Sequence, residues 1–329
     1  MTGQSLALMI RPFVLLDLPT LHRYRHRGFF LDTTTAVTWG AAVVPAGALL
    51  THLAPATGIF TYLGKADSGK KQIIVAQVVH NNHSSCARFS FLAPESALGT
   101  AALPQMVEYV AHKVGERGGH NLVAEVDETT QVFDVLRESG FAIYGRQRAW
   151  SLAGLPAPDR RAVPWRPVRD RDGIAVRTLY NVLVPGLTQQ VETPPWEPLR
   201  GLVLPDGDGL LAYASLTYGP RGIMVYPFFH PDAGQVAKRL VEMLSKIPNR
   251  RGRPVYIGIR SYQAWLETAL EDLGALAGAR QAVMVKRLVA TVQKPALAPL
   301  PALKGRTANP TVPIARSFST TAGTSDSQQ

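Results

Sequence analysis

The chain has 329 residues, of which 46% are hydrophobic and 18% are charged, and this balance predicts a globular protein with more than one apolar core. Its single cysteine, Cys86, excludes an internal disulfide framework and a cysteine-rich metal site, and fits a reducing, cytoplasmic compartment. The formal net charge of +11 is spread over short basic clusters, so we expect a solvated basic surface and no nucleic-acid partner.

The N-terminal segment has no basic stretch ahead of its short apolar run, so we expect no signal peptide. Residues 33–64 contain no Asp, Glu, Lys or Arg. Pro45, His52 and Pro55 interrupt this region, and no window of about 18 residues in it is apolar enough for a membrane span. We therefore expect a buried helix and a loop there.

The first half of the chain combines strand-like and helical patterns. Asp17 precedes an apolar-periodic stretch, whose helix it can cap by accepting backbone N–H bonds. Three strands should follow, with a polar hairpin turn at 81–85 between the second and the third, and then a helix, a strand, a helix and a last strand. The expected ranges are 59–63, 72–79, 87–93, 101–118, 122–126, 130–139 and 141–152.

The second half repeats this order with shorter loops, at 209–218, 222–229, 235–247, 254–259, 264–273 and 279–289. Each half begins with an Arg-Pro pair, at Arg11 and Arg166, and ends in a basic strand with an Arg-Gln pair, at Arg146 and Arg280. We therefore predict two tandem domains, 1–152 and 165–290, joined by a linker at 153–164. The Pro-, Ser- and Thr-rich residues 291–329 are predicted to be a disordered tail.

Small residues precede the first long helix of the repeated order in each half. They are Leu98-Gly99-Thr100-Ala101 in the first and Ala233-Gly234-Gln235 in the second. A helix N-terminus presents free backbone N–H groups and the positive end of the helix dipole, so it favours a phosphate group. Both segments are candidate phosphate sites.

In this order of elements, residues 6–152 and 160–290 resemble the GNAT superfamily of N-acetyltransferases. The stretches 94–103 and 230–240 are similar to shortened forms of the family's acyl-CoA pyrophosphate motif, and Val135 to Phe141 resembles its last helix with a Gly-Phe ending. The resemblance implies an α/β (mixed α+β) fold of two tandem domains. Each would contain a mixed, mostly antiparallel, splayed sheet flanked by helices.

The resemblance also implies the transfer of an acetyl group to an amine by direct attack on the thioester of acetyl-CoA, or of another acyl-CoA. The acyl-CoA would lie between the fourth and fifth strands, and the implied cofactor-binding residues are Phe91, Leu92, Ala93, Leu98, Gly99, Thr100, Ala101, Phe229, Gly234 and Gln235. The acceptor, a small-molecule amine or a protein, is not readable from the sequence. Two fused copies can mimic a dimer within one chain.

The tyrosine that many members use as an acid toward the thiolate is replaced by Leu136 and Leu270, which cannot donate a proton. Tyr226 and Tyr262, at or just beyond strand ends of the second half, are candidates for this role, or are simply buried, hydrogen-bonded tyrosines. Glu95 is a candidate base, although the dipole of the following helix also explains an acidic residue there.

Asp127 and Glu128 follow a strand and are candidate bases or plain loop carboxylates. His80, His83 and Cys86 lie close together around the hairpin, but their spacing matches no established zinc pattern, so we expect no metal. Because the tyrosine and much of both phosphate motifs are missing, the alternative stays open that the protein is catalytically inactive and binds a ligand or a partner.

Overall fold

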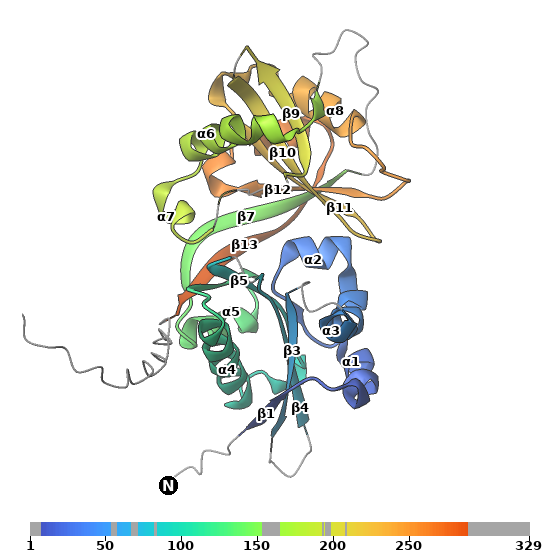
Figure 1. The fold of residues 1–329 in the computed structure, drawn as a ribbon, viewed down its shortest axis with the longest axis vertical. Helices are drawn as coiled ribbons and strands as arrows, with labels where there is room; N and C mark the ends of the chain where they lie inside the picture. The colour runs from blue at the N-terminus through green and yellow to red at the C-terminus, as the bar shows by residue number, and fades with distance from the viewer. Residues whose placement is uncertain are drawn as a thin grey trace, which may run out of the picture. The chain divides into compact units, whose positions relative to one another are not determined.

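The structure is a computed structural model that describes residues 8–53, 58–66, 72–81, 84–152, 165–192, 194, 199–207 and 209–288. The predicted linker and the predicted tail lie outside these residues. Figure 1 shows the elements of the first half, which are β1 (Met9–Pro12), η1 (Leu15–Asp17), α1 (Leu18–Tyr24), β2 (Phe29–Phe30), α2 (Thr33–Thr38), η2 (Gly40–Ala42), α3 (Val43–Leu53), β3 (Ile59–Ala66), β4 (Gln72–Val79), β5 (Cys86–Ala93), η4 (Glu95–Ala97), α4 (Ala102–Glu116), β6 (Asn121–Asp127), α5 (Gln131–Glu138) and β7 (Ala142–Leu152).

The second half follows the same plan with a shorter lead-in. Its elements are β8 (Arg166–Pro167), η5 (Asp170–Asp172), α6 (Gly173–Leu183), α7 (Gly186–Gln189), β9 (Gly201–Asp206), β10 (Gly209–Tyr218), β11 (Ile223–Phe229), η6 (Pro231–Ala233), α8 (Val236–Ser245), β12 (Val255–Arg260), η7 (Ser261–Gln263), α9 (Leu266–Asp272) and β13 (Leu276–Arg287). The elements labelled η are short 3-10 helices.

The strands of the described residues form one 13-stranded sheet, in which the two halves exchange their last strands. The order is β1-β3-β4-β5-β6-β13-β7-β12-β11-β10-β9-β8, so β13 lies between β6 and β7, and β7 lies between β13 and β12. The pairs β5–β6 and β11–β12 are parallel, and the other pairs are antiparallel. The predicted mixed, mostly antiparallel sheet flanked by helices is confirmed.

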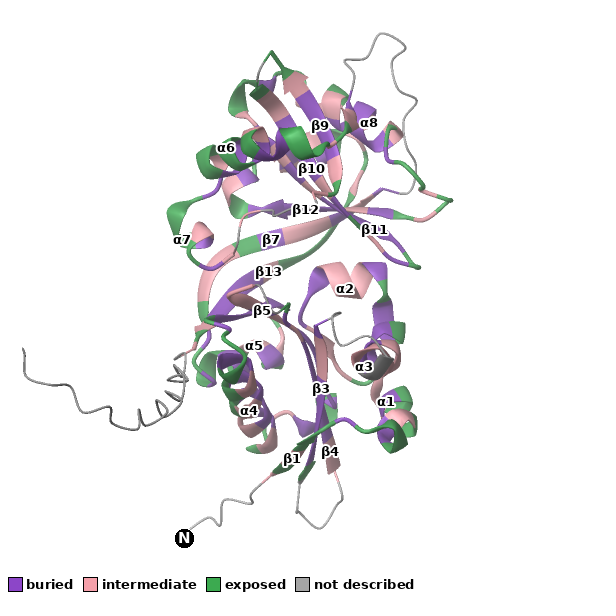
Figure 2. Cartoon of the chain, in the orientation of Figure 1, coloured by how far each residue is buried: buried purple, intermediate pink, exposed green. Residues whose placement is uncertain are grey.

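The main hydrophobic core of each half contains the exchanged strand of the other half. The core under α4 and α5 includes Ala282 and Met284 of β13, and the core under α8 and α9 includes Trp150 and Leu152 of β7. Figure 2 shows the buried residues concentrated on the strands and on the inner sides of the helices. Residues up to Thr291 form one compact unit. The boundaries at 152 and 165 stay a prediction, and both of these cores contain residues from both repeats.

The two Arg-Pro pairs build the same local structure. Arg11 donates from Nη1 and Nη2 to the two carboxylate oxygens of Asp17, at 2.7 and 2.6 Å, and Arg166 does the same to Asp172, at 2.7 and 2.8 Å. Asp17 also accepts the N–H of Val14 at 2.9 Å, and its side chain does not cap α1. The predicted cap is therefore wrong, because the bidentate, charge-assisted pair with Arg11 takes the carboxylate instead.

The uncharged region forms the helices α2 and α3. Buried Val43, Val44 and Ala48 pack in one apolar cluster with Leu63 and Val75 of the neighbouring strands, so the expected buried helix is present. Throughout the described ranges, each helix is too short or too polar to cross a membrane.

Candidate active site

The parallel strands β5 and β6 pair only at their beginning, where residues 86–88 face residues 121–123. Beyond this point β5 bulges at Ser90, because Phe89 and Phe91 pair with consecutive residues of β4. From the bulge onward, β5 presents backbone groups that are not paired with β6.

The chain fills this opening with its own backbone. β2 pairs antiparallel with β5 at Phe91 and Leu92. Leu31, just after β2, donates its N–H to Ser90 O at 3.0 Å and accepts the N–H of Glu125 on β6 at 2.8 Å. The segment therefore joins β5 to β6 as an inserted strand would.

Gly28 permits this close approach. A Cβ at this position would lie 2.5 Å from Ala93 Cβ and 2.5 Å from Leu92 O, so a larger residue could not keep the same place. The edge of β5 that we assigned to the acyl-CoA, at Phe91, Leu92 and Ala93, is thus covered by the chain itself. In this conformation β2 pairs with the edge of β5 that a ligand would need, and the assignment of these residues to an acyl-CoA stays a prediction.

The second parallel pair has a different arrangement. β11 pairs with β12 from Ile223 to Val225 and then separates from it. In place of a strand, the carboxamide of Gln263 in η7 binds this edge of β11: its Nε2 donates to Pro227 O at 2.9 Å and its Oε1 accepts the N–H of Phe229 at 2.9 Å. A single buried side chain therefore makes hydrogen bonds to the edge of β11, whereas in the first half a whole segment pairs with the edge of β5.

A pocket of about 190 Å³ lies beside the point where β11 and β12 separate. It is lined by Arg88, Tyr180, Glu192, Ser215, Tyr226, Phe228, Arg260 and Tyr262. Arg88 belongs to the first half and the other residues to the second, so both halves build this tyrosine pocket. Two predicted catalytic residues, Tyr226 and Tyr262, meet here. The third, Glu95, is exposed in η4 and does not line this pocket.

Charged side chains of alternating sign run through the wall of the tyrosine pocket. Arg260 Nη2 lies 2.7 Å from Glu192 Oε1 and 3.5 Å from Glu125 Oε1. Arg88 Nη1 lies 3.3 Å from Glu125 Oε1 and 3.3 Å from Asp32 Oδ1. Glu125 is only 1% exposed at its side chain and has a guanidinium on either side. Each charge is therefore compensated, as burial requires.

The surroundings of the two acids in this network shift their pKa values in opposite directions. Burial disfavours the charged form of Glu125, but Arg260 and Arg88 outweigh it and hold the pKa of this carboxyl below its usual range. Burial raises the pKa of Asp32, and the Glu125 carboxylate adds to the rise against the opposing effect of Arg88. Glu125 thus keeps its negative charge, and Asp32 is the group that takes up a proton first.

Comparison with solved structures shows which fold this is. No protein-family model matches the sequence. No curated protein matches it either. A GCN5-related N-acetyltransferase from Sphaerobacter thermophilus superposes with a TM-score of 0.55 at 13% identity, over 85% of this chain and 95% of that one. An acetyltransferase candidate from Pyrococcus horikoshii gives a TM-score of 0.51 at 11% identity, over 88% and 92%. Both matches include both halves. The chain has the GNAT fold.

In the GNAT fold of this chain, α4 follows β5 and α8 follows β11, and the two predicted phosphate sites lie just before these helices. Gly99 before α4 has φ +75°, and Gly234 and Gln235 before α8 have φ +32° and +49°. A Cβ at Gly99 would meet nothing within 4 Å, and one at Gly234 would meet only Asp232 O at 4.0 Å. Both glycines therefore leave open space beside the backbone. The predicted Leu98, Thr100 and Ala101 flank Gly99, and Leu98 packs against the core.

Leu136 and Leu270, which stand where many GNAT proteins have a tyrosine, are fully buried in the hydrophobic core. Tyr226 and Tyr262 come from other elements, and burial raises the pKa of both phenols above the usual value. The hydroxyl of Tyr226 lies 3.3 Å from Thr34 Oγ1 of α2. Both phenols thus carry their protons near neutral pH, as an ordinary tyrosine does, and burial makes each of them a weaker acid.

The charged network was not predicted from the sequence. Its signal was present, because Arg88, Glu125 and Arg260 each lie in an apolar strand, and a charge in such a strand requires a buried partner. Their partners come from distant parts of the chain, so the pairing could not be named in advance.

The remaining candidates lie outside the tyrosine pocket. Asp127 accepts the N–H of Thr129 at 2.9 Å, and Glu128 pairs with Arg146 at 2.7 Å. His80 Nε2 contacts Ser84 O at 2.8 Å, and His83 lies outside the described residues. No group of three potential metal ligands occurs in the part of the chain that the structure describes.

Proposed function

We propose that the protein is an acyl-CoA-dependent N-acyltransferase whose working half is the second. The observation that carries this proposal is the contrast between the two parallel strand pairs. β2 covers the first, whereas the second holds no inserted strand among the described residues and adjoins a pocket with two protonated tyrosines. The first half keeps more of the cofactor motif in its sequence. Because β2 covers the edge of β5 there, we nevertheless prefer the second half as the acyl-CoA site.

The second half offers groups that fit an acyl-CoA. Pro227 O and the N–H of Phe229 face the space between β11 and β12 and are held only by the side chain of Gln263. The start of α8 can receive a pyrophosphate at Gly234 and Gln235 through backbone N–H groups. Arg239 on this helix has a buried Nη1 without a hydrogen-bond partner among the described residues, and it can supply a charge for a phosphate.

When bound, the acyl-CoA supplies the thioester whose acyl group is transferred to the amine. Tyr226 and Tyr262, the two phenols that line this pocket beside Glu192, would donate the proton that the leaving thiolate needs. Glu192 is the carboxylate of the same pocket, fixed by Arg260 and by the hydroxyl of Tyr144, and it would accept the proton of the attacking amine. The acceptor amine, a cytoplasmic location and the lack of a nucleic-acid partner stay predictions from the sequence.

Calorimetric titration with acetyl-CoA, with desulfo-CoA and ATP as comparison ligands, tests this proposal. We expect saturable binding at one site. Gly234→Asp should abolish it, because it places a carboxylate where the pyrophosphate would lie, and Gly99→Asp should leave it unchanged. The two variants are matched, since both glycines have positive φ and open space for a side chain. Loss of binding in Gly99→Asp alone would place the site in the first half.

One observation favours the alternative, a catalytically inactive binding protein. The Gln263 carboxamide satisfies the same two groups of β11 that an acyl-CoA would use, and Gln263 is only 3% exposed. If this side chain permanently closes the site, the unaltered protein will not bind acetyl-CoA but Gln263→Ala will. If Gln263 merely yields to the ligand, both will bind, with higher affinity in the variant.

A further inference from the structure

A second pocket lies on the opposite face of the sheet, between β7, β13 and the start of α9. Its volume is about 210 Å³, and it is lined by Arg146, Gln147, Arg148, Ile259, Ser261, Ala264, Glu267 and Arg280. Side chains alternate between the faces of a strand, so Ile259 of β12 lines this pocket while Arg260 lines the tyrosine pocket. We call this second site the arginine pocket.

Three arginines converge in the arginine pocket. Arg146 and Arg148 are two residues apart on β7 and therefore share one face. Arg280 of β13 lies directly opposite Arg148 in the antiparallel register. Like charges placed directly opposite each other destabilise a sheet, so the arrangement is costly unless an anion relieves it.

A bulge in β13 produces this convergence. Between Ala277 and Arg280, β13 contains one residue more than β7 does over the same register. Without the extra residue, Ala279 would face Arg148 and the side chain of Arg280 would turn to the other face of the sheet. A Cβ at Gly278 would lie 2.7 Å from Ala149 O, so the bulge requires glycine at this position.

The carboxylates nearby do not balance the charge. Arg148 Nη1 pairs with Glu267 at 3.3 Å, and Arg146 Nε pairs with Glu128 at 2.7 Å. Arg280 is exposed, and within the described ranges its side chain has no ion pair or hydrogen bond. Arg148 Nε is buried and also lacks a partner there. One solvent-exposed guanidinium and one buried N–H group are thus available to an anion.

We propose that the arginine pocket binds the phosphate group of a small phosphorylated molecule. Arginine forks match the geometry of phosphate oxygens, and a volume of about 210 Å³ suits a small ligand. The site is independent of acyl transfer, because it lies on the other face of the sheet and shares no lining residue with the tyrosine pocket. It also explains the repeated Arg-Gln pairs, whose arginines at 146 and 280 line this pocket.

Calorimetric titration with inorganic phosphate, at constant ionic strength and without any CoA compound, tests the proposal. We expect saturable binding in the full chain that persists in Gly234→Asp, which blocks the candidate phosphate site before α8 and so separates that site from the arginine pocket. Arg280→Glu should weaken phosphate binding at least about tenfold, since a charge-assisted bond is replaced by repulsion. Arg280→Ala should weaken it less, in the same direction.

The matched control is Arg23→Glu, which changes the net charge equally at an exposed position of α1. It should leave phosphate affinity unchanged, and circular dichroism should show all of these variants folded. Absence of saturable binding to the unaltered protein would overturn the proposal. So would equal weakening by Arg280→Glu and Arg23→Glu, because it would indicate a general charge effect. Neither outcome depends on whether the protein binds acetyl-CoA.

Discussion

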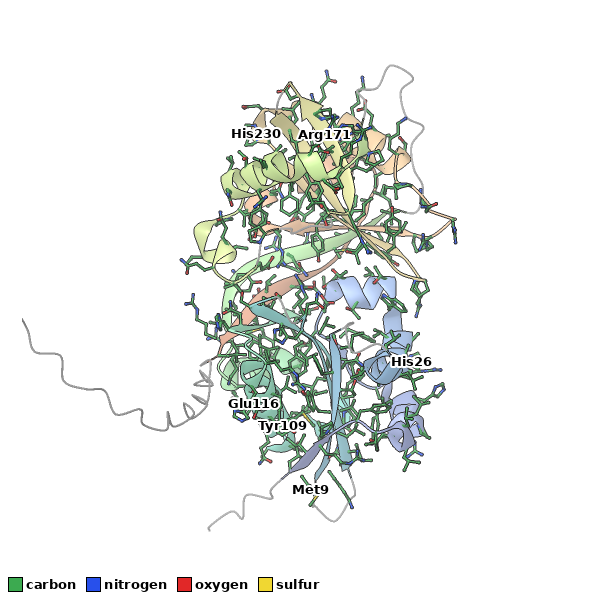
Figure 3. All side chains as sticks on the ribbon, in the orientation of Figure 1. Met9, His26, Tyr109, Glu116, Arg171 and His230 are labelled. Carbon is green, nitrogen blue, oxygen red and sulfur yellow. The ribbon has the colours of Figure 1, made fainter. Side chains whose placement is uncertain are left out.

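The Nε2 of Gln147 donates to the Oε1 of Gln281 at 3.0 Å, although 134 residues separate them in the chain. The two glutamines hold the same place in their repeats, each directly after an arginine, and they lie opposite each other in β7 and β13. Thr33 joins them, since its Oγ1 accepts from Gln147 at 3.0 Å and donates to Gln281 at 2.8 Å. Figure 3 shows side chains filling this region between α2 and the two exchanged strands. Equivalent residues of the two repeats thus meet where the strands are exchanged.

Gln147→Ala is expected to lower the free energy of unfolding by about 1–3 kcal/mol, because it leaves buried polar atoms of Thr33 and Gln281 with fewer partners. Urea denaturation measures this. The double variant Gln147→Ala with Gln281→Ala should cost less than the sum of the single variants, since both remove the same hydrogen bond. Strict additivity would show that the two side chains are not coupled.

Tyr226→Phe should lower kcat by about a hundredfold or more with an amine acceptor, while acetyl-CoA affinity stays unchanged, because the phenol acts as an acid and not as a binding group. Steady-state kinetics together with calorimetry separate these two effects. Tyr256→Phe on β12 is the control, since Tyr256 does not line the tyrosine pocket. If Tyr226→Phe keeps the full rate, Tyr226 is not the acid. Tyr262 would then be the candidate, and Tyr262→Phe would test it.

Asp172→Asn should destabilise the protein by about 2 kcal/mol at neutral pH. The hydrogen bond from Arg166 lowers the pKa of Asp172 to about 2, against an ordinary value of 3.8. A lowered folded-state pKa gives stability that is complete above the unfolded value and is lost as the pH falls through the folded value. The unaltered protein and the variant should therefore converge in stability as the pH falls from about 4 to about 2.

Thermal melts over this pH range test the prediction, with Asp206→Asn at an exposed position of β9 as the control. A stability difference between Asp172→Asn and the unaltered protein that does not change with pH would contradict the ionic origin of the effect. The matching pair, Arg11 with Asp17, should show the same sign because it has the same bidentate geometry.

Gly28→Ala should destabilise the first half by about 1–3 kcal/mol, as overpacked substitutions do, because the new methyl group collides with Leu92 and Ala93. Gly145→Ala on β7 is the matched control, since a Cβ there meets nothing within 4 Å. Chemical denaturation compares the two. Hydrogen exchange should also show faster exchange at the β2 and β5 amides in Gly28→Ala only. Equal stability of both variants would mean that β2 does not approach β5 this closely.

The order of elements was readable from the sequence because local signals determine it. Alternating and helical apolar patterns placed β4, β5, α4, α5, β10 and β11 close to their observed bounds. The repeated Arg-Pro pairs marked a shared local structure, since Arg11 and Asp17, or Arg166 and Asp172, are only six residues apart. Tyr226 and Tyr262 were predicted from their places at strand ends, and both line one pocket.

Only the tertiary structure decided how the edge of each parallel strand pair is filled, by β2 in the first half and by Gln263 in the second. The insertion of β2 depends on contacts between residues about 60 to 90 positions apart, and the Gln263 carboxamide reaches back more than 30 residues to β11. The charged network and the strand exchange also join residues that are far apart in the chain, such as Glu125 and Arg260, so no local pattern encodes them. The sequence by itself determined that this fold occurs twice. The two copies differ because long-range packing covers the edge of β5 with another segment of the chain but leaves the edge of β11 to a single side chain.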